Sequence, residues 1–122
     1  MIIPEILWRD QEYKDCKWRH HGQADSYENL EWDSSNTVSK PTKAQLQSKW
    51  ASISTEIAFE KLRVKRDKLL AETDWWAVSD RTMSSEEKSY RSALRDITQT
   101  AQPTIDQWGN LNESSVTWPA KP

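Results

Sequence analysis

The hydrophobic pattern of the chain is dominated by one long uninterrupted segment between residues 42 and 72. Pro41 is followed by Thr42 and, three residues later, by Gln45, a spacing that forms a capping box at the start of a helix. Neither Gly nor Pro occurs again before residue 72. We therefore expect a single helix of about 30 residues, where about 11–12 is typical of globular proteins. Such a length is characteristic of a helix that projects from its domain or meets another chain.

The apolar positions of this helix lie on two faces, one after the other. The first stripe is spaced by four, three and four residues, as in a coiled-coil heptad, and consists of Leu46, Trp50, Ile53 and Ile57. The second stripe, largely apolar and on a different face, consists of Phe59, Leu62, Arg66, Leu69 and Leu70. The front and back halves of the helix are therefore expected to face different neighbours.

A second, shorter helix is indicated after residue 84. Ser84 and Glu87 form another capping box, and Pro103 prevents a long continuation. We expect this helix to pack antiparallel on the back half of the long one, with Trp75 filling the corner and Trp118 folding back over the open side. The apolar face of the shorter helix consists of Tyr90, Ala93, Leu94 and Ile97.

The first 41 residues show no helical period. Residues 27–32 and the stretch from Ile2 to Trp8 are each compatible with a short strand. The sequence thus predicts a mainly α fold, in which a long helix and a shorter antiparallel helix form a hairpin. An irregular or weakly β segment over 1–41 precedes the hairpin, and the unit spanning 42–122 ends in an extended C-terminal tail.

The first stripe has no partner within this hairpin. Leaving such side chains in water costs roughly 1.5–3 kcal/mol each, so either the N-terminal segment or another chain must cover them. We therefore treat one set of residues as a hypothetical partner-binding surface: Leu46, Trp50, Ile53 and Ile57.

Composition favours an interaction protein over an enzyme. The chain of 122 residues is 35% hydrophobic and 30% charged, with a net charge of -2 and eight tryptophans. The balanced charge gives no general attraction to nucleic acid or anionic lipid, whereas tryptophan is enriched at protein interfaces. No apolar run approaches the roughly 20 residues of a membrane span, and the first residues lack the pattern of a signal peptide.

Candidate chemistry is sparse. His20 and His21 are adjacent, and adjacent side chains of an extended chain point to opposite faces, which disfavours a metal site. The single cysteine, Cys16, permits no internal disulfide and has no evident base beside it. Two glycines are too few for a phosphate-binding loop. We therefore expect no enzymatic activity, no metal and no cofactor.

A basic cluster on the long helix leaves one alternative open, a nucleic-acid-binding accessory protein that uses residues 61–68. Acidic residues are interspersed on the same helix, which favours a solvated surface with salt bridges and makes nucleic acid the weaker alternative. The cluster consists of Lys61, Arg63, Lys65, Arg66 and Lys68.

Three motifs follow one another in the second half of the chain. The first reads Leu62-Arg63-x-x-Arg66-Asp67-x-Leu69-Leu70 and then Asp74-Trp75. The second is Tyr90-Arg91-x-x-Leu94-Arg95-Asp96-Ile97, and the third is Val116-x-Trp118-Pro119-x-x-Pro122. In this order they resemble the tail assembly chaperone domain of tailed bacteriophages over about residues 60–122. The chain departs from that pattern at Thr98, where the family usually has proline, and in a longer segment between residues 98 and 115.

The resemblance implies a phage tail or tail-fibre protein as the partner. The uncovered first stripe could also bind a second copy of the chain, so self-association is a further possibility, and the lack of a long apolar run predicts no membrane contact. It also implies action in the host cytoplasm during assembly, or retention in the virion tail. We interpret the motif residues as a set that locks the hairpin, in which an arginine either pairs with Asp74 or stacks on Trp75. The set consists of Leu62, Arg66, Leu69, Leu70, Asp74, Trp75, Tyr90, Arg91, Leu94, Arg95, Ile97 and Trp118.

Overall fold

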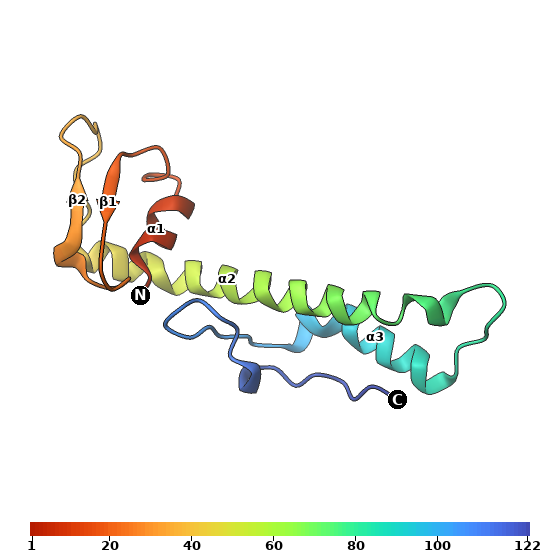
Figure 1. Ribbon diagram of the computed structural model, residues 1–122. Coiled ribbons are helices and arrows are strands. Elements are labelled where there is room, and N and C mark those ends of the chain that lie inside the picture. Colours follow the sequence, from red (N-terminus) through yellow and green to blue (C-terminus); the bar gives the residue numbers. More distant parts are fainter.

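The computed structural model describes residues 1–122 and is organised along one long helix, α2 (Lys43–Ala71). Figure 1 shows α1 (Ile3–Arg9) and two short strands beside the first half of α2, and α3 (Ser85–Thr100) with the C-terminal tail beside its second half. Short 3-10 helices occur at Tyr27–Asn29, Asp74–Ala77 and Glu113–Ser115. The predicted mainly α fold class, with a helical hairpin, is confirmed.

Both long helices begin at the predicted capping boxes. The amide of Gln45 donates to the hydroxyl of Thr42, and the Thr42 amide donates to the Gln45 side chain at 2.8 Å. Ser84 and Glu87 make the same reciprocal pair at the start of α3. Each box satisfies two of the amides that a helix start leaves without partners, so the bounds of both helices are local properties of the sequence.

The N-terminal segment forms a small module of α1 and a two-stranded antiparallel sheet. Strands β1 (Trp18–His20) and β2 (Leu30–Trp32) pair with Arg19 opposite Glu31. The sequence prediction of a strand from Ile2 to Trp8 is wrong, because this stretch is the helix α1. Its buried residues Ile3, Ile6 and Leu7 are spaced by three and one, which places all three on one helical face.

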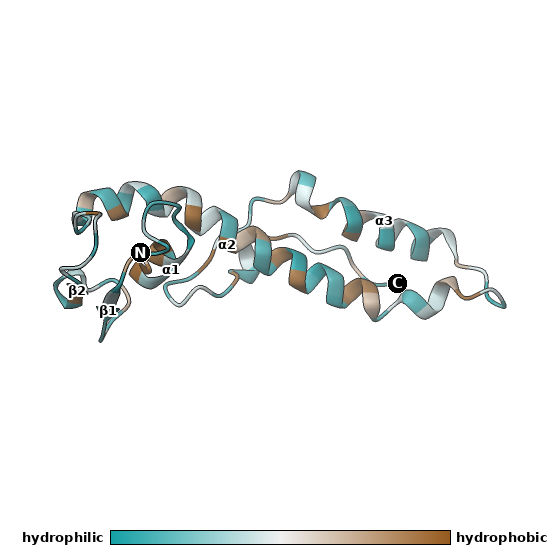
Figure 2. Ribbon diagram, turned by 90° about the horizontal axis from the view of Figure 1, so that it is seen from above, coloured by the Kyte–Doolittle hydropathy of each residue, from teal (hydrophilic) through white to brown (hydrophobic).

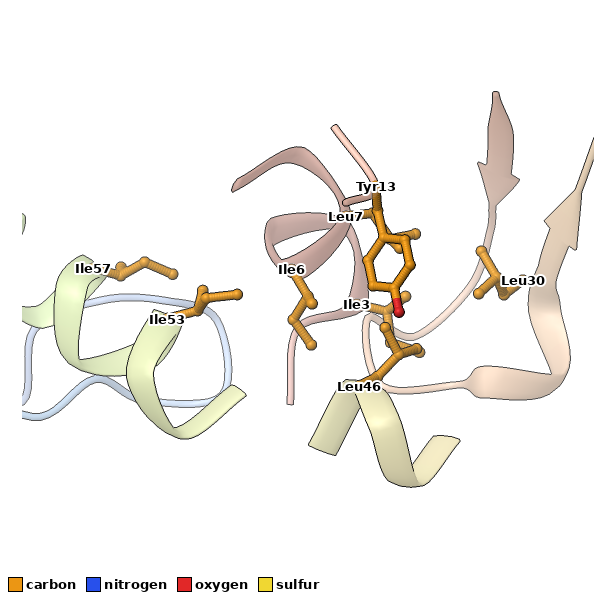
Figure 3. Packing of buried hydrophobic residues seen from close by; sticks show 8 residues of the cluster. All are labelled: Ile3, Ile6, Leu7, Tyr13, Leu30, Leu46, Ile53 and Ile57. Carbon is orange, nitrogen blue, oxygen red and sulfur yellow. The ribbon is translucent and has the colours of Figure 1, made fainter. Parts of the chain in front are cut away.

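This N-terminal module covers the front half of α2. Leu46, Ile53 and Ile57 are buried in one cluster with residues of α1, and Trp50 packs against its edge half-buried. Figure 3 shows Ile53 and Ile57 pointing from α2 towards Ile6. The hypothesis that these four residues form a partner-binding surface is therefore corrected: the chain's own N-terminal segment buries Leu46, Ile53 and Ile57 and leaves only Trp50 half-buried.

The back half of α2 packs against α3 and the C-terminal tail in two further clusters. One contains Leu62, Ile97 and Val116, and the other contains Trp76, Tyr90 and Leu94. The packing units thus meet between Ile57 and Leu62, inside α2, and not at residue 41. In Figure 2 the ribbons of the hairpin helices are mostly coloured hydrophilic and are interrupted by separate hydrophobic turns.

Candidate interaction surface

The corner of the hairpin is fastened by Arg91 of α3. Its guanidinium donates to the carbonyl of Leu70 at 2.9 Å, to the hydroxyl of Thr73 at 2.7 Å and to the carboxylate of Asp74 at 3.0 Å. The last carbonyls of a helix lack partners within the helix, and the C-terminal end of the helix dipole attracts a cation. Arg91 supplies this cation at the end of α2, where the Leu70 carbonyl also accepts from the Thr73 amide at 3.0 Å, and the fully buried Thr73 lies between the two helices.

The tip of the hairpin carries two adjacent tryptophans with opposite environments. Trp76 is buried against Tyr90 and Leu94, whereas Trp75 is 58% exposed. The guanidinium of Arg81 lies 4.7 Å from the ring centre of Trp75 and 5.9 Å from that of Trp76. Arg81 thus contacts both rings, with Trp75 directed to solvent.

A bidentate ion pair fixes the position of Arg81. Its two terminal nitrogens lie 2.6 Å and 3.0 Å from the carboxylate oxygens of Glu87, and it also donates to the carbonyl of Trp76 at 3.2 Å. The hydrogen bond to Arg81 lowers the pKa of Glu87. Because Glu87 is also the acidic member of the capping box, one carboxylate fixes both the start of α3 and the tip loop.

The C-terminal tail runs back over the hairpin and is held by Trp118. This ring packs against both hairpin clusters. Its indole nitrogen donates to Glu113 at 3.2 Å, and the ammonium of Lys65 lies 4.8 Å from the ring centre. Lys65 also pairs with Glu113, and this hydrogen bond lowers the pKa of that carboxyl group.

The structure brings together only part of the predicted hairpin-locking set. Arg91 and Asp74 form the predicted type of pair, while Leu62, Tyr90, Leu94 and Ile97 are buried and Leu69, Leu70 and Trp118 are half-buried around them. Three of the predicted residues do not contribute as expected. Arg66 pairs with its neighbour Asp67, Arg95 is exposed without a hydrogen bond, and Trp75 does not fill the corner because Trp76 does.

Sequence reasoning missed Arg81, which joins the two tryptophans to Glu87. It lies in a connector without periodicity, so no pattern singled it out. An arginine six residues before a capping-box glutamate is the only local signal. Together Trp75, Val78 and Arg81 form what we call the hairpin-tip patch, in which Val78 is 46% exposed.

The basic cluster on α2 is largely engaged within the protein. Lys65 pairs with Glu113, Arg66 with Asp67, and the guanidinium of Arg63 lies over the ring of Phe59 at 5.7 Å. Lys61 and Lys68 make no ion pair. The five cations therefore do not form one uncompensated face.

The residues considered as candidates for chemistry are Cys16, His20 and His21. Each of them contacts a backbone carbonyl or one neighbouring side chain. The thiol of Cys16 lies 3.8 Å from the carbonyl of Glu12, and His20 contacts the carbonyl of Ser26 at 3.1 Å. His21 lies 4.0 Å from Glu31. No group of three or more His, Cys, Asp or Glu side chains is arranged to hold a metal ion. None of the helices combines the length and apolar character needed to cross a membrane.

Comparison with known proteins gives one finding, and it falls on the hairpin. The family model of phage tail assembly chaperone proteins matches residues 59–122, just over half of the chain. The match begins just after Ile57, the last α2 residue buried in the N-terminal cluster, and it covers the back half of α2, α3 and the tail. No curated protein and no solved structure matches the chain.

Proposed function

Because this chain belongs to the phage tail assembly chaperone family, we propose that it assists tail assembly by direct contact with a tail or tail-fibre protein. The hairpin-tip patch is the docking surface in this proposal. The contact takes place in the host cytoplasm, where it covers apolar surface of the partner that would otherwise aggregate before assembly.

The exposure of Trp75 on a rigid support is the observation that carries this proposal. Tryptophan and arginine are the residues most enriched at the energetic centres of protein interfaces. Here the ion pair with Glu87 holds Arg81 against the Trp75 ring. Arg91 fixes the C-terminal end of α2, just before Trp75 in the chain. A side chain that is already ordered loses less conformational entropy on binding than a mobile one.

Charged side chains of this protein join separate segments of the chain. This structural role agrees with a protein that acts by contact and not by catalysis. Arg9 and Lys49, whose pKa values are raised by hydrogen bonds to carboxylates, lie in ion pairs between separate segments. Arg9 of α1 binds Glu60 of α2 through both terminal nitrogens, at 2.7 Å and 2.9 Å, and Lys49 of α2 binds Asp10 at 2.8 Å. These pairs fasten the N-terminal module to the long helix.

The alternative of a nucleic-acid-binding accessory protein rests on the basic helix at 61–68. Its support is reduced by the pairing of Lys65 and Arg66 with acidic residues. The two proposals differ in salt dependence, since binding through phosphate contacts weakens steeply as salt is raised. Titration of the protein with duplex DNA at two salt concentrations separates them.

The test of the proposal is co-purification with the tail and tail-fibre proteins of the same phage, each co-expressed with the chain. We expect a complex with wild type that is weakened at least about tenfold by Trp75→Ala, the size typical of an interface centre. Trp108→Ala is the matched control, because Trp108 is also exposed, at 74%, but lies in the loop before Gly109, outside the patch. Equal affinity of wild type and Trp75→Ala would place the docking surface elsewhere.

Two further questions need separate measurements: whether the chain stays in the virion, and whether it self-associates. Presence of the chain in purified virions would identify a retained tail component, and absence would identify a transient assembly factor. Light scattering of the isolated protein would detect self-association. The burial of Leu46, Ile53 and Ile57 removes the stripe through which copies were first expected to associate.

A further inference from the structure

The outer edge of β1 offers unpaired backbone groups. The sheet has only two strands, so β1 has a neighbour on one side. The amide of Asp33 donates to the carbonyl of Lys17 at 3.1 Å, and hydrogen-bonded pairs alternate along an antiparallel ladder. The next bonded pair is therefore Arg19 with Glu31. The N–H and C=O groups of Trp18 and His20 consequently point away from β2, to the open edge.

A shallow groove of about 800 Å³ lies at β1. Its lining includes all three β1 residues and also Glu31 of β2, the cross-strand neighbour of Arg19. Trp8 of α1 forms part of the lining and is 63% exposed, with its ring centre 5.5 Å from that of Trp18. Figure 1 shows α1 on the side of β1 opposite β2.

The charges around the groove are predominantly positive. Lys14, Lys17 and Arg19 line it, are exposed and take part in no ion pair. Glu31 is the only acidic residue in the lining, and it lies 4.0 Å from His21. Asp33 lies outside the lining, across the ladder from Lys17. An incoming segment therefore meets three unpaired cations beside two tryptophan rings.

We propose that the open edge of β1 binds an extended acidic peptide segment of a partner protein as a third strand of the sheet. The backbone of the segment pairs with Trp18 and His20, an apolar side chain contacts Trp8, and acidic side chains meet the three cations. Strand addition of this kind obtains its affinity from main-chain hydrogen bonds and its specificity from the side-chain environment. The site lies outside residues 59–122 and does not depend on the hairpin-tip patch.

A peptide fits these features better than a nucleic acid does. The unpaired groups of a strand edge alternate donor and acceptor at the spacing of another strand, which a sugar-phosphate backbone does not match. Tryptophan rings and cations serve both classes of partner, so the edge is the feature that separates them.

The test measures binding of a fluorescent peptide of alternating glutamate and valine to the full-length protein by anisotropy. We expect saturable binding at low salt, stronger than for the lysine–valine counterpart and weakened by added salt. His20→Pro removes the outward N–H and is tolerated at a strand edge, and it should weaken binding about tenfold. His20→Ala loses the same side chain but retains the N–H, and should stay within about twofold.

Two further comparisons make the outcome decisive. The charge-reversed Lys14→Glu/Lys17→Glu variant should lose binding, whereas Lys61→Glu/Lys68→Glu, with the same change in net charge on α2, should not. The acidic peptide methylated at every amide nitrogen has no N–H group left on either edge and should not bind wild type, which tests strand pairing even if His20→Pro fails to fold. Equal binding of acidic and basic peptides, equal effects of the two His20 variants, unimpaired binding of the methylated peptide, or tighter binding of oligo-dT would each overturn the proposal.

Discussion

The hydroxyl of Thr73 accepts a hydrogen bond from Arg91 at 2.7 Å and itself donates to the carbonyl of Leu70 at 3.1 Å. A fully buried polar side chain thus connects α3 to the last turn of α2. Because an unsatisfied buried polar group is costly, this relay can form only when both helices are in register. These hydrogen bonds therefore form a joint that fixes the register of α2 and α3 at the hairpin corner. Apolar contact alone would allow the two helices to slide past each other.

Removing this joint should destabilise the isolated protein. Arg91→Ala deletes three hydrogen bonds donated by a charged group, one of which goes to the largely exposed Asp74. We expect a loss of roughly 1.5–3 kcal/mol in the free energy of unfolding, measured by urea denaturation followed by circular dichroism. Arg95→Ala is the matched control, since Arg95 lies one turn further on α3, exposed and without a hydrogen bond. A change below about 0.5 kcal/mol is expected there, and equal effects of the two variants would contradict the joint.

Helix bounds could be predicted from the sequence because they depend on neighbouring residues. The capping boxes at Thr42 and Ser84 require only residues three apart, and both formed as predicted. The partner of the first α2 stripe could not be predicted, because it depends on where residues 1–41 fold. Ile3, Ile6 and Leu7 carry too short a pattern to distinguish a helix from a strand, and only the tertiary structure places them on α2.

The hairpin residues also divide into those that the sequence could predict and those that depend on the tertiary structure. The motif identified the residues around the corner, but neighbouring tryptophans cannot be ordered by periodicity, and Trp76 is buried where Trp75 was expected. Arg81 escaped notice because its role arises from a loop that returns to the start of α3. Contacts made across a turn of irregular backbone leave no period in the sequence.

The corrected role of the first α2 stripe leads to a second prediction. Ile57 is 3% exposed under α1, whereas Val64, two turns further along the same helix, is 69% exposed. Ile57→Ala should lower the free energy of unfolding of the isolated protein by about 2–5 kcal/mol, the range for truncating a buried isoleucine. Val64→Ala should change it by less than about 0.5 kcal/mol. If Ile57→Ala left stability unchanged and only reduced binding to a tail protein, the original surface hypothesis would return.

Acid should destabilise the protein through the ion-paired carboxylates. Arg9 lowers the pKa of Glu60, Arg81 that of Glu87 and Lys65 that of Glu113, each from an ordinary value of 4.5. A carboxyl group with a lowered pKa in the folded state stabilises that state above its unfolded pKa, and this stabilisation is lost as the pH falls through the folded value. We therefore expect the thermal midpoint to fall between about pH 5 and pH 3.

Glu87→Gln separates charge from helix capping in this pH response. Glutamine can still complete a capping box, but it cannot titrate or form the ion pair with Arg81. The variant should therefore show a shallower fall of the thermal midpoint over the same pH range, measured by circular dichroism. Parallel curves for wild type and variant would show that the Arg81 pair contributes nothing to acid sensitivity.

The last prediction concerns the tail, whose attachment depends on one ring. Trp118 contacts both hairpin clusters and receives Lys65 on its face, and Glu113 accepts hydrogen bonds from both residues. Trp118→Ala should therefore release the end of the tail while α2 and α3 remain helical, because their caps lie elsewhere. Hydrogen exchange of the peptide that includes the Val116 amide, bonded to the Glu113 carbonyl at 3.2 Å, should accelerate, since local opening exposes that amide. Trp108→Ala, which removes an exposed ring from the same C-terminal segment, should leave this exchange unchanged. Slow exchange in both variants would show that Val116, buried against Leu62 and Ile97, holds the tail without the indole.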